Sequence, residues 1–244
     1  MGFPPSPPPF EDVQRVLCVA AHPDDIDFGY AGTVAGFVDA GLEVTYLLVT
    51  RGDAGGFDDT PRDQMPALRE AEQRAAAEAV GVKDVRFLDG YADGTLTVTL
   101  ALRRDISRVV RQVRPDRILT NSPIRRWDRI GAGHPDHLAV GEATTCAVYP
   151  DARNPFAFPE LLRDEGLEPW IVREVWYSGG PDPDHVMDIT DAYPKKLAAL
   201  QAHITQTANM DLDARLRMML GANAQRAGLP EGRLAEAFSV IQTS

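Results

Sequence analysis

The sequence predicts an α/β fold with a mostly parallel sheet and helices on both of its faces. Short apolar runs rich in β-branched residues alternate with longer segments that have helical periodicity. Each apolar run also ends at a polar or glycine-rich loop. Buried parallel strands end in this way, because helices cover both faces of their sheet. In this architecture, ligands bind outside the carboxyl ends of the strands.

The expected strands are short, continuous apolar runs. The first, RVLCVAA (residues 15–21), ends at the polar sequence HPDD. The second, EVTYLLVT (residues 43–50), ends at the glycine-rich loop RGDAGGFDDTPRD. Three further strands are expected at residues 84–88, 117–120 and 171–177.

The expected helices lie between these strands and after them. Residues 29–40 have small and apolar side chains at helical spacing and stop before Gly41. Residues 67–80 are rich in Ala, Glu and Arg and stop before Gly81. A glycine after the last turn is a typical helix C-cap. Further helices are expected at residues 100–113, 138–149, 193–207 and 212–227, with a proline-punctuated loop at 153–169.

The composition is that of an ordinary globular chain and excludes some classes of partner. With 244 residues, 44% of them hydrophobic and 25% charged, the chain is long enough for one large domain. We expect a proline-rich leader at residues 1–12 and a single domain at residues 13–244. The net charge of −11 argues against non-specific binding to nucleic acid or to an anionic membrane. No apolar run is long enough to span a bilayer.

The two cysteines, Cys18 and Cys146, lie far apart in apolar surroundings. This placement is typical of free thiols in a reducing compartment, so we expect a cytoplasmic protein. We also expect a homo-oligomer that takes a small-molecule substrate and has no nucleic-acid or membrane partner.

An imidazole and two carboxylates follow the first expected strand within four residues, at His22, Asp24 and Asp25. An aspartate at this place could simply cap the helix that follows. Capping accounts for one carboxylate and leaves the histidine and the second carboxylate unexplained. A His-x-x-Asp spacing can bring one nitrogen and one oxygen ligand to a cation from a single turn. A helix cap and a metal site are therefore the two alternatives at this loop.

A second cluster, HPDH at residues 134–137, comes after the fourth expected strand and begins a helical run. Pro135 suits a first helical turn, so a capped helix start with two incidental histidines is the alternative. The chain has only five histidines, however, and two of them fall in these four residues. Both clusters lie on strand-to-helix loops that can meet at one edge of the sheet. His22, Asp25 and His137 could then bind a metal ion and leave a fourth position for water, as in catalytic zinc sites.

Both clusters, with their flanking segments, resemble the PIG-L/LmbE family of zinc-dependent N-deacetylases. The family signatures AHPDDE and HPDH correspond here to AHPDDID at residues 21–27 and to HPDH at residues 134–137. The resemblance extends to TRGDAGG (50–56), LREAE (68–72), YADGTL (91–96) and DITDAYPKKLAALQAHITQ (188–206). It implies a Rossmann-like, LmbE-like deacetylase fold for the single domain, with Zn²⁺ or Fe²⁺ as the cofactor.

The resemblance implies a role for each polar residue of the two motifs. The metal ligands would be His22, Asp25 and His137. Asp24 would be the general base that takes a proton from the zinc-bound water, whose pKa zinc lowers to about 7. His134 would be protonated and would stabilise the oxyanion or assist the leaving amine. Asp136 would orient His134 and favour its charged form.

The resemblance also implies two substrate contacts. Arg69 would bind a sugar hydroxyl or a phosphate, and an intrahelical pair with Glu72 or Gln73 is the alternative. Asp93 would contact sugar hydroxyls, although an aspartate before Gly94 also suits an ordinary turn.

One position departs from the family pattern, because Ile26 stands where AHPDDE has its glutamate, and Asp27 follows. That glutamate is not a metal ligand in the family, so the departure concerns the surroundings of the ligands. Whether Asp27 replaces it stays open. His203 is expected to be structural, and His185 either reaches the mouth of the site or lies in a solvated loop. The cluster at residues 125–129 either binds an anionic or sugar-stacking substrate or is a solvated loop.

The function that these residues imply is hydrolysis of an amide. We expect a metal-dependent deacetylase that removes the N-acetyl group from an N-acetylglucosamine-type sugar or its conjugate. One alternative is an amidase that uses the same residues to cleave a larger acyl group, such as a cysteinyl amide, from a thiol–sugar conjugate. Another is a non-catalytic sugar-binding α/β module. No G-x-G-x-x-G follows a strand and no P-loop motif is present, which argues against a nucleotide-binding module.

Overall fold

The computed structural model describes residues 12–56, 60–128, 130 and 133–243. Within these ranges one sheet has seven strands in the order β3-β2-β1-β4-β5-β7-β6. They are β1 (Arg15–Ala20), β2 (Glu43–Leu48), β3 (Asp84–Phe87), β4 (Arg117–Asn121), β5 (Glu174–Ser178), β6 (His185–Asp188) and β7 (Ala235–Gln242). Strands β1 to β5 pair in parallel, and β7 is antiparallel to both β5 and β6. The predicted mostly parallel sheet is confirmed, whereas nearly all of the expected leader lies outside the described residues.

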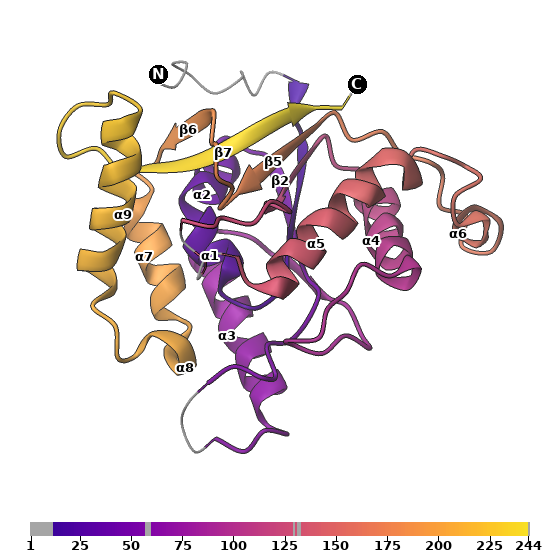
Figure 1. The fold of residues 1–244 in the computed structure, drawn as a ribbon, viewed down its shortest axis with the longest axis horizontal. Coiled ribbons are helices and arrows are strands. Elements are labelled where there is room, and N and C mark those ends of the chain that lie inside the picture. The colour runs from indigo at the N-terminus through magenta and orange to yellow at the C-terminus, as the bar shows by residue number, and fades with distance from the viewer. Residues whose placement is uncertain (1–11, 57–59, 129, 131–132, 244) are drawn as a thin grey trace.

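Helices cover both faces of this sheet (Figure 1). They are α1 (Asp25–Gly29), α2 (Ala31–Asp39), α3 (Met65–Ala79), α4 (Leu100–Val113), α5 (Pro135–Cys146), α6 (Pro159–Arg163), α7 (Tyr193–Gln201), α8 (Ile204–Thr207) and α9 (Leu212–Arg226). Val16 and Cys18 of β1 pack in the core with α2 and α3, whereas Leu17 and Val19 pack in the core with α4 and α5. Because β1 is buried on both faces after Arg15, the rest of the strand is apolar at successive positions rather than alternating.

The C-terminal third of the sheet differs from the prediction. Strands β6 and β7 were not expected, and both extend the sheet by antiparallel pairing. Strand β6 is only four residues long and contains His185 and Asp188. Strand β7 carries Glu236 at a buried position. These polar residues interrupt the apolar pattern that identified the parallel strands.

Two helical segments differ from the prediction. The helix expected at residues 29–40 is α2, and the short α1 that precedes it, separated from it by a non-helical Tyr30 with φ −155°, was not expected. The segment predicted as one helix at 193–207 is divided into α7 and α8 at His203, whose ψ of 62° is not helical. In the structure this break places the His203 side chain in the interior, where it is fully buried.

A buried ion pair joins α7 to β7. Lys196 Nζ lies 2.7 Å from Glu236 Oε1, and both side chains are completely buried. The Glu236 carboxylate also accepts hydrogen bonds from the main-chain N–H groups of Gly32 and Thr33, at 3.0 and 2.7 Å. These groups lie in the first turn of α2, where Tyr30 makes no side-chain capping bond. The Glu236 carboxylate therefore caps α2 although it belongs to a strand far away in the sequence. Its negative charge interacts favourably with the positive N-terminal end of the helix dipole.

Replacing this lysine should destabilise the fold strongly. We expect Lys196→Met to lower the free energy of unfolding by about 3–5 kcal/mol, because the Glu236 carboxylate would stay buried without its counter-charge. The matched control is Lys195→Met, since Lys195 pairs with Asp39 at 2.6 Å but both side chains are exposed. The control should cost no more than about 1 kcal/mol. Urea unfolding of both variants measures the difference, and equal losses would contradict this assignment.

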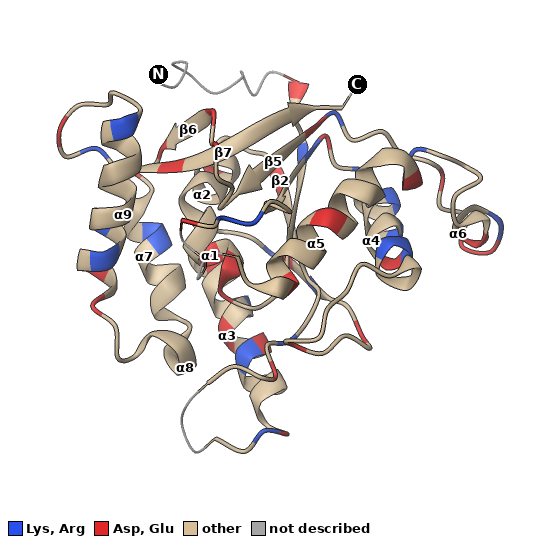
Figure 2. Ribbon diagram, viewed as in Figure 1, with Lys and Arg blue, Asp and Glu red and all other residues tan. Residues whose placement is uncertain are grey.

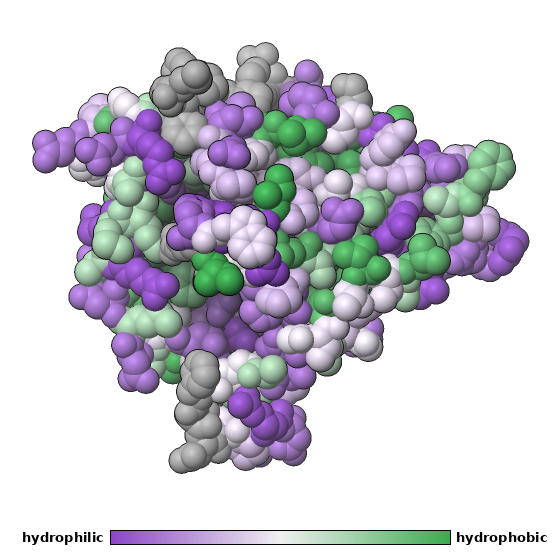
Figure 3. Space-filling model, in the orientation of Figure 1, coloured by the Kyte–Doolittle hydropathy of each residue, from purple (hydrophilic) through white to green (hydrophobic). Residues whose placement is uncertain are grey.

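The surface is mixed in character. Exposed hydrophobic side chains are interspersed with hydrophilic ones on the face shown in Figure 3. None of the helices in the described ranges has the length and apolar character needed to span a membrane. Both cysteines are free, as expected, although Cys146 is only partly buried.

Candidate metal and catalytic site

The loop between β1 and α1 turns sharply at Asp24. Its φ of 89° and ψ of −24° lie in the left-handed region. A non-glycine residue there stores about 1–3 kcal/mol of strain, and such residues cluster at functional sites. The side chain of Asp24 makes no capping bond to α1, so the capping alternative is wrong for this residue. Asp25 Oδ2 closes the turn instead, by accepting the main-chain N–H of His22 at 2.9 Å.

The second motif forms the start of α5. His134 is the N-cap residue, and its Nδ1 accepts the main-chain N–H of Asp136 at 3.2 Å. Pro135 occupies the first turn, as expected. Because Nδ1 accepts a hydrogen bond, the proton of the neutral ring is on Nε2. His134 can therefore cap the helix and also take part in the site. The cap fixes the ring through Nδ1 and leaves the Nε2–H as a donor.

The two motifs meet where the strand order reverses. The chain passes from β1 to β2 and β3 on one side and then to β4 on the other side of β1. Ligands bind at such switch points in α/β sheets. The rings of His22, His134 and His137 lie with their centroids 5.0–5.3 Å apart. Acidic residues, red in Figure 2, lie on α1 and in the first turn of α5.

Asp25 contacts both histidines that are expected to bind the metal with it, His22 and His137. Its Oδ1 lies 2.9 Å from His137 Nε2, and its Oδ2 lies 3.4 Å from His22 Nδ1. On the other side of the ring, His22 Nε2 lies 2.8 Å from Asp93 Oδ1 and 3.1 Å from Asp136 Oδ2. Burial opposes a charge on His22, but hydrogen bonds to Asp136 and Asp25 outweigh it and raise the pKa of His22 to about 12.

These donors fit a metal ion. In the described residues, two groups have ligand atoms that all lie within 4.8 Å of one another: His22 with His134 and His137, and His22 with Asp93 and Asp136. Imidazole nitrogens and carboxylate oxygens are ligands that both zinc and ferrous iron accept. The expected set of His22, Asp25 and His137 shares two histidines with the first group, and Asp25 contacts both of them.

Arg69 holds the carboxylate of Asp24. It is 3% exposed, and its Nη2 donates to Asp24 Oδ2 at 3.0 Å and to the Pro23 carbonyl at 2.6 Å. Its Nη1 donates to the carbonyl of Gly52 at 3.1 Å, and a Cβ at Gly52 would come within 2.1 Å of that nitrogen. Glycine at position 52 therefore makes room for the guanidinium. Burial raises the pKa of Asp24 to about 6, although the charge of Arg69 opposes the rise.

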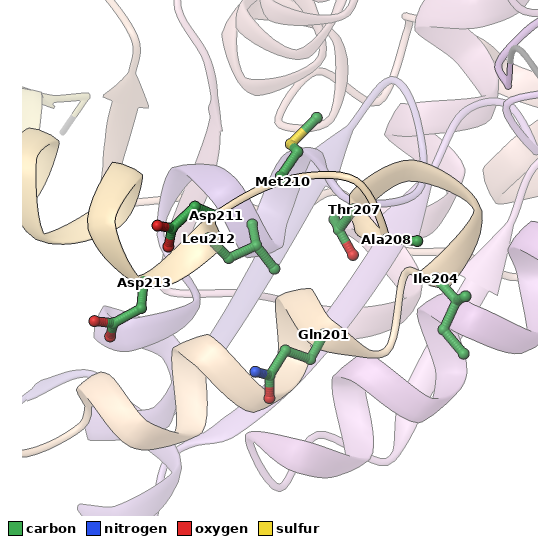
Figure 4. Close-up of a pocket in the computed structure, with 8 residues that line it drawn as sticks. All are labelled: Gln201, Ile204, Thr207, Ala208, Met210, Asp211, Leu212 and Asp213. Carbon is green, nitrogen blue, oxygen red and sulfur yellow. The ribbon is translucent and has the colours of Figure 1, made fainter.

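A cavity of about 480 Å³ opens beside the motifs. Asp25 and His137 line it, together with Arg126 and with residues of α9 that include Met219 and Arg226. Its volume falls within the range typical of small-molecule sites. A second pocket of about 370 Å³ lies where α7, α8 and α9 meet (Figure 4), and none of its lining residues is a predicted site residue.

The comparisons with known proteins agree with this geometry. The model of the PIG-L family, described as GlcNAc-PI de-N-acetylase, matches residues 17–148. The chain belongs to the PIG-L family. It is 35% identical to diacetylchitobiose deacetylase of Thermococcus kodakarensis over 81% of this chain and 72% of that protein. It is 32% identical to a probable N-acetyl-α-D-glucosaminyl L-malate deacetylase 2 of Bacillus anthracis, over 80% of this chain and 82% of that protein.

A solved structure confirms the predicted fold. N,N'-diacetylchitobiose deacetylase from Pyrococcus horikoshii superposes with a TM-score of 0.87 and 28% identity, over 96% of this chain and 86% of that one. These relatives are named as deacetylases, so the predicted class of enzyme is confirmed along with the PIG-L family.

Two roles carried over from the PIG-L resemblance need correction. The carboxylate of Asp136 was expected to pair with His134, but it is fully buried and contacts His22 and the main-chain N–H groups of Gly94 and Leu96. Only the main-chain N–H of Asp136 reaches His134. The pKa of His134 is lowered by burial and by the charges of His22 and His137, opposite to the expected direction.

The predicted substrate contacts are also placed differently. The Nη1 and Nη2 groups of Arg69 donate to Asp24 and to two carbonyls, rather than to Glu72 or Gln73. Asp93 does lie at a turn, where Gly94 has φ +81°, and its carboxylate contacts His22. Asp93 is therefore both a turn residue and a neighbour of the site residue His22.

Asp27 and the two histidines outside the motifs have distinct environments. Ile26 is in the core, and the Asp27 carboxylate is fully buried against Gln73 and His203. His203 is structural in this sense, as expected. His185 lies on β6 rather than in a loop, beside Asp184 and the ring of Trp176.

Of the cluster at 125–129, Arg126 lines the 480 Å³ cavity, Trp127 is 82% exposed, and residue 129 lies outside the described residues.

Sequence reasoning gave Gln73 no role in the site beyond a possible pair with Arg69. Its Oε1 accepts the main-chain N–H of Asp24 at 2.9 Å. The signal was present, because Arg69, Glu72 and Gln73 share the face of α3 that also buries Met65 and Ala76. Polar residues at core-facing helical positions need partners, and here the HPDD loop supplies them.

Proposed function

We propose that this chain is a metal-dependent deacetylase that removes the N-acetyl group from an N-acetylglucosamine unit of a small glycoside. The observation that carries the proposal is the convergence of Asp24, three histidines and Asp25 at one sheet edge, beside a cavity of about 480 Å³. The relatives are named for diacetylchitobiose and for N-acetyl-α-D-glucosaminyl L-malate. These compounds share the acetylated glucosamine and differ in what it is attached to.

The metal is assigned to His22, Asp25 and His137. His22 and Asp25 lie on the turn that follows β1, and His137 lies in the first turn of α5. A bound zinc ion supplies Lewis-acid polarisation of the amide carbonyl and makes water a stronger nucleophile at neutral pH. Ferrous iron suits the same donors.

Asp24 is the general base. Its Oδ2 is held by Arg69, while Oδ1 has no hydrogen-bond partner in the described part of the chain. Oδ1 can therefore accept the proton of the attacking water as the oxygen bonds to the amide carbon. A carboxyl whose pKa lies near the working pH is effective in this role.

His134 stabilises the charge that develops on the carbonyl oxygen. Its ring is fixed by the cap to the Asp136 N–H, and within the described residues its Nε2–H makes no hydrogen bond and remains as a donor. A donor that is oriented before the reaction is worth more than one that must reorient. When the C–N bond breaks, the amine nitrogen takes up the proton that Asp24 accepted, and acetic acid leaves and gives its remaining proton to the solvent as acetate.

Acetate release tests the proposal. The zinc-loaded protein should release one acetate per N-acetyl group from N-acetylglucosamine or diacetylchitobiose. A chelator such as dipicolinate should abolish the release, and added zinc should restore it. Release of an amino acid from a cysteinyl amide of glucosamine, without acetate from any acetylated sugar, would favour the amidase alternative. Sugar binding by the zinc-loaded protein without any hydrolysis would overturn the proposal.

A further inference from the structure

The HPDD loop is connected to the C-terminal helices by a chain of buried hydrogen bonds. The main-chain N–H of Asp24 donates to Gln73 Oε1 at 2.9 Å. Gln73 Nε2 donates to Asp27 Oδ2 at 2.8 Å, and the His203 Nε2 lies 2.8 Å from the same oxygen. The side chains of Gln73, Asp27 and His203 are all fully buried. Three segments that are far apart in the sequence therefore meet next to Asp24, the proposed general base.

The order of these bonds fixes which end of the Gln73 amide faces Asp24. Asp27 presents a carboxylate oxygen, which attracts the NH₂ group of the amide rather than its oxygen. The amide oxygen must then point to Asp24, where it accepts the main-chain N–H. A glutamine is suited to this position because it offers one donor and one acceptor at the ends of a short planar group.

A second, separate contact joins α3 to the C-terminal helices. Glu72, next to Gln73 on α3, accepts hydrogen bonds from the main-chain N–H and the hydroxyl of Thr205, at 2.8 and 2.7 Å. Thr205 belongs to α8, which follows His203 and lies beside α3 in Figure 1. The Glu72 contact also joins α3 to α8, but in the described part of the chain Glu72 makes no hydrogen bond to the HPDD loop.

We propose that Gln73 is a positioning residue for Asp24, oriented by Asp27 and His203. This inference rests on the proposed function, in which Asp24 is the general base. Asp24 holds a left-handed backbone conformation that surrounding contacts must maintain. Arg69 holds its carboxylate from one side, and Gln73 holds its main-chain N–H from the other. Ile26 stands where the family motif has a glutamate, and Asp27 follows it. The carboxylate of Asp27 supports Asp24 through Gln73.

The test compares two neighbouring methionine variants. Gln73→Met keeps the length of the side chain and removes both hydrogen bonds. We expect kcat for acetate release to fall by about 10- to 100-fold, as is typical when a group that orients a site residue is lost. KM and bound zinc should stay within about twofold of the wild type, because neither the cavity nor the ligands change. The matched control is Glu72→Met, which removes the contact between α3 and α8 and should leave kcat within about twofold.

Crystal structures of the variants separate this proposal from the proposed function. In Gln73→Met, Asp24 should leave the left-handed conformation or its carboxylate should shift away from Arg69, and in Glu72→Met neither should change. If the wild type shows no deacetylase activity, the proposed function fails, while the structures still test the positioning role. An unchanged Asp24 in Gln73→Met would overturn the inference. Equal losses of kcat in both variants, with equal losses of melting temperature, would also overturn it.

Discussion

Asp24→Asn should lower kcat for acetate release by about 10²- to 10⁴-fold, the range typical of losing a general base. The bound metal should be unchanged, because Asp24 is not among the assigned ligands. Steady-state kinetics, together with metal analysis of the purified variant, measures both quantities.

Asparagine is the substitution that isolates proton transfer at this position. Asp24 has φ 89°, and asparagine is among the few residues that tolerate the left-handed region. Its amide oxygen can still accept the hydrogen bond from Arg69, so the loop keeps both of its supports. The melting temperature should therefore not fall. Alanine would confound the measurement, since it would add backbone strain and leave Arg69 without its carboxylate.

The control for this variant is Asp53→Asn. Asp53 accepts the main-chain N–H of Asp93 at 3.0 Å, so it supports the neighbouring turn without touching Asp24. Its kcat should stay within about tenfold of the wild type, a smaller loss than the one expected for the base. If Asp24→Asn keeps full activity with metal bound, the proton acceptor is another group.

The parts of the fold that were predicted have a local signal. Strand β1 is apolar from Val16 to Ala20 because these residues are buried on both faces of the sheet, so its sequence alone identifies it. The motifs at residues 22–25 and 134–137 each place several polar groups within one turn, the first directly after β1 and the second at the start of α5, after the loop that follows β4. The architecture then brings the two turns together, because β1 and β4 are neighbours. Local sequence patterns and the general rules of α/β topology were therefore sufficient to predict strand β1 and the meeting of the two motifs.

The parts that were not predicted depend on a choice between distant partners. Asp136 could have paired with His134, two residues away, but its carboxylate contacts His22, which lies on another loop. Gln73 could have paired with Arg69 on its own helix, but it contacts Asp24 and Asp27. No local pattern distinguishes these partners, because the hydrogen-bonding capacity of each side chain is the same in both arrangements.

His137→Ala should reduce the affinity of the protein for zinc by more than about 100-fold. Loss of a group that merely orients a ligand typically costs 10- to 100-fold, so loss of a ligand should exceed that range. The side chain is 22% exposed in the first turn of α5, so its removal should not open the apolar core. Competition against a chromophoric chelator measures the affinity. His185→Ala is the control, because His185 lies on β6 and should leave zinc binding unchanged.

His134→Ser separates the two possible ligand sets. Serine can keep the cap on the Asp136 N–H, so α5 should still begin at Pro135. If His22, Asp25 and His137 hold the metal, this variant should retain zinc with near wild-type affinity, and kcat should fall by about 10²- to 10³-fold because the oxyanion donor is lost. If His134 is itself a ligand, as the distances among the three histidines allow, the variant should lose zinc as His137→Ala does. Loss of zinc from His134→Ser would therefore replace the assigned ligand set with the three-histidine set, whereas an active, zinc-loaded His137→Ala would contradict both.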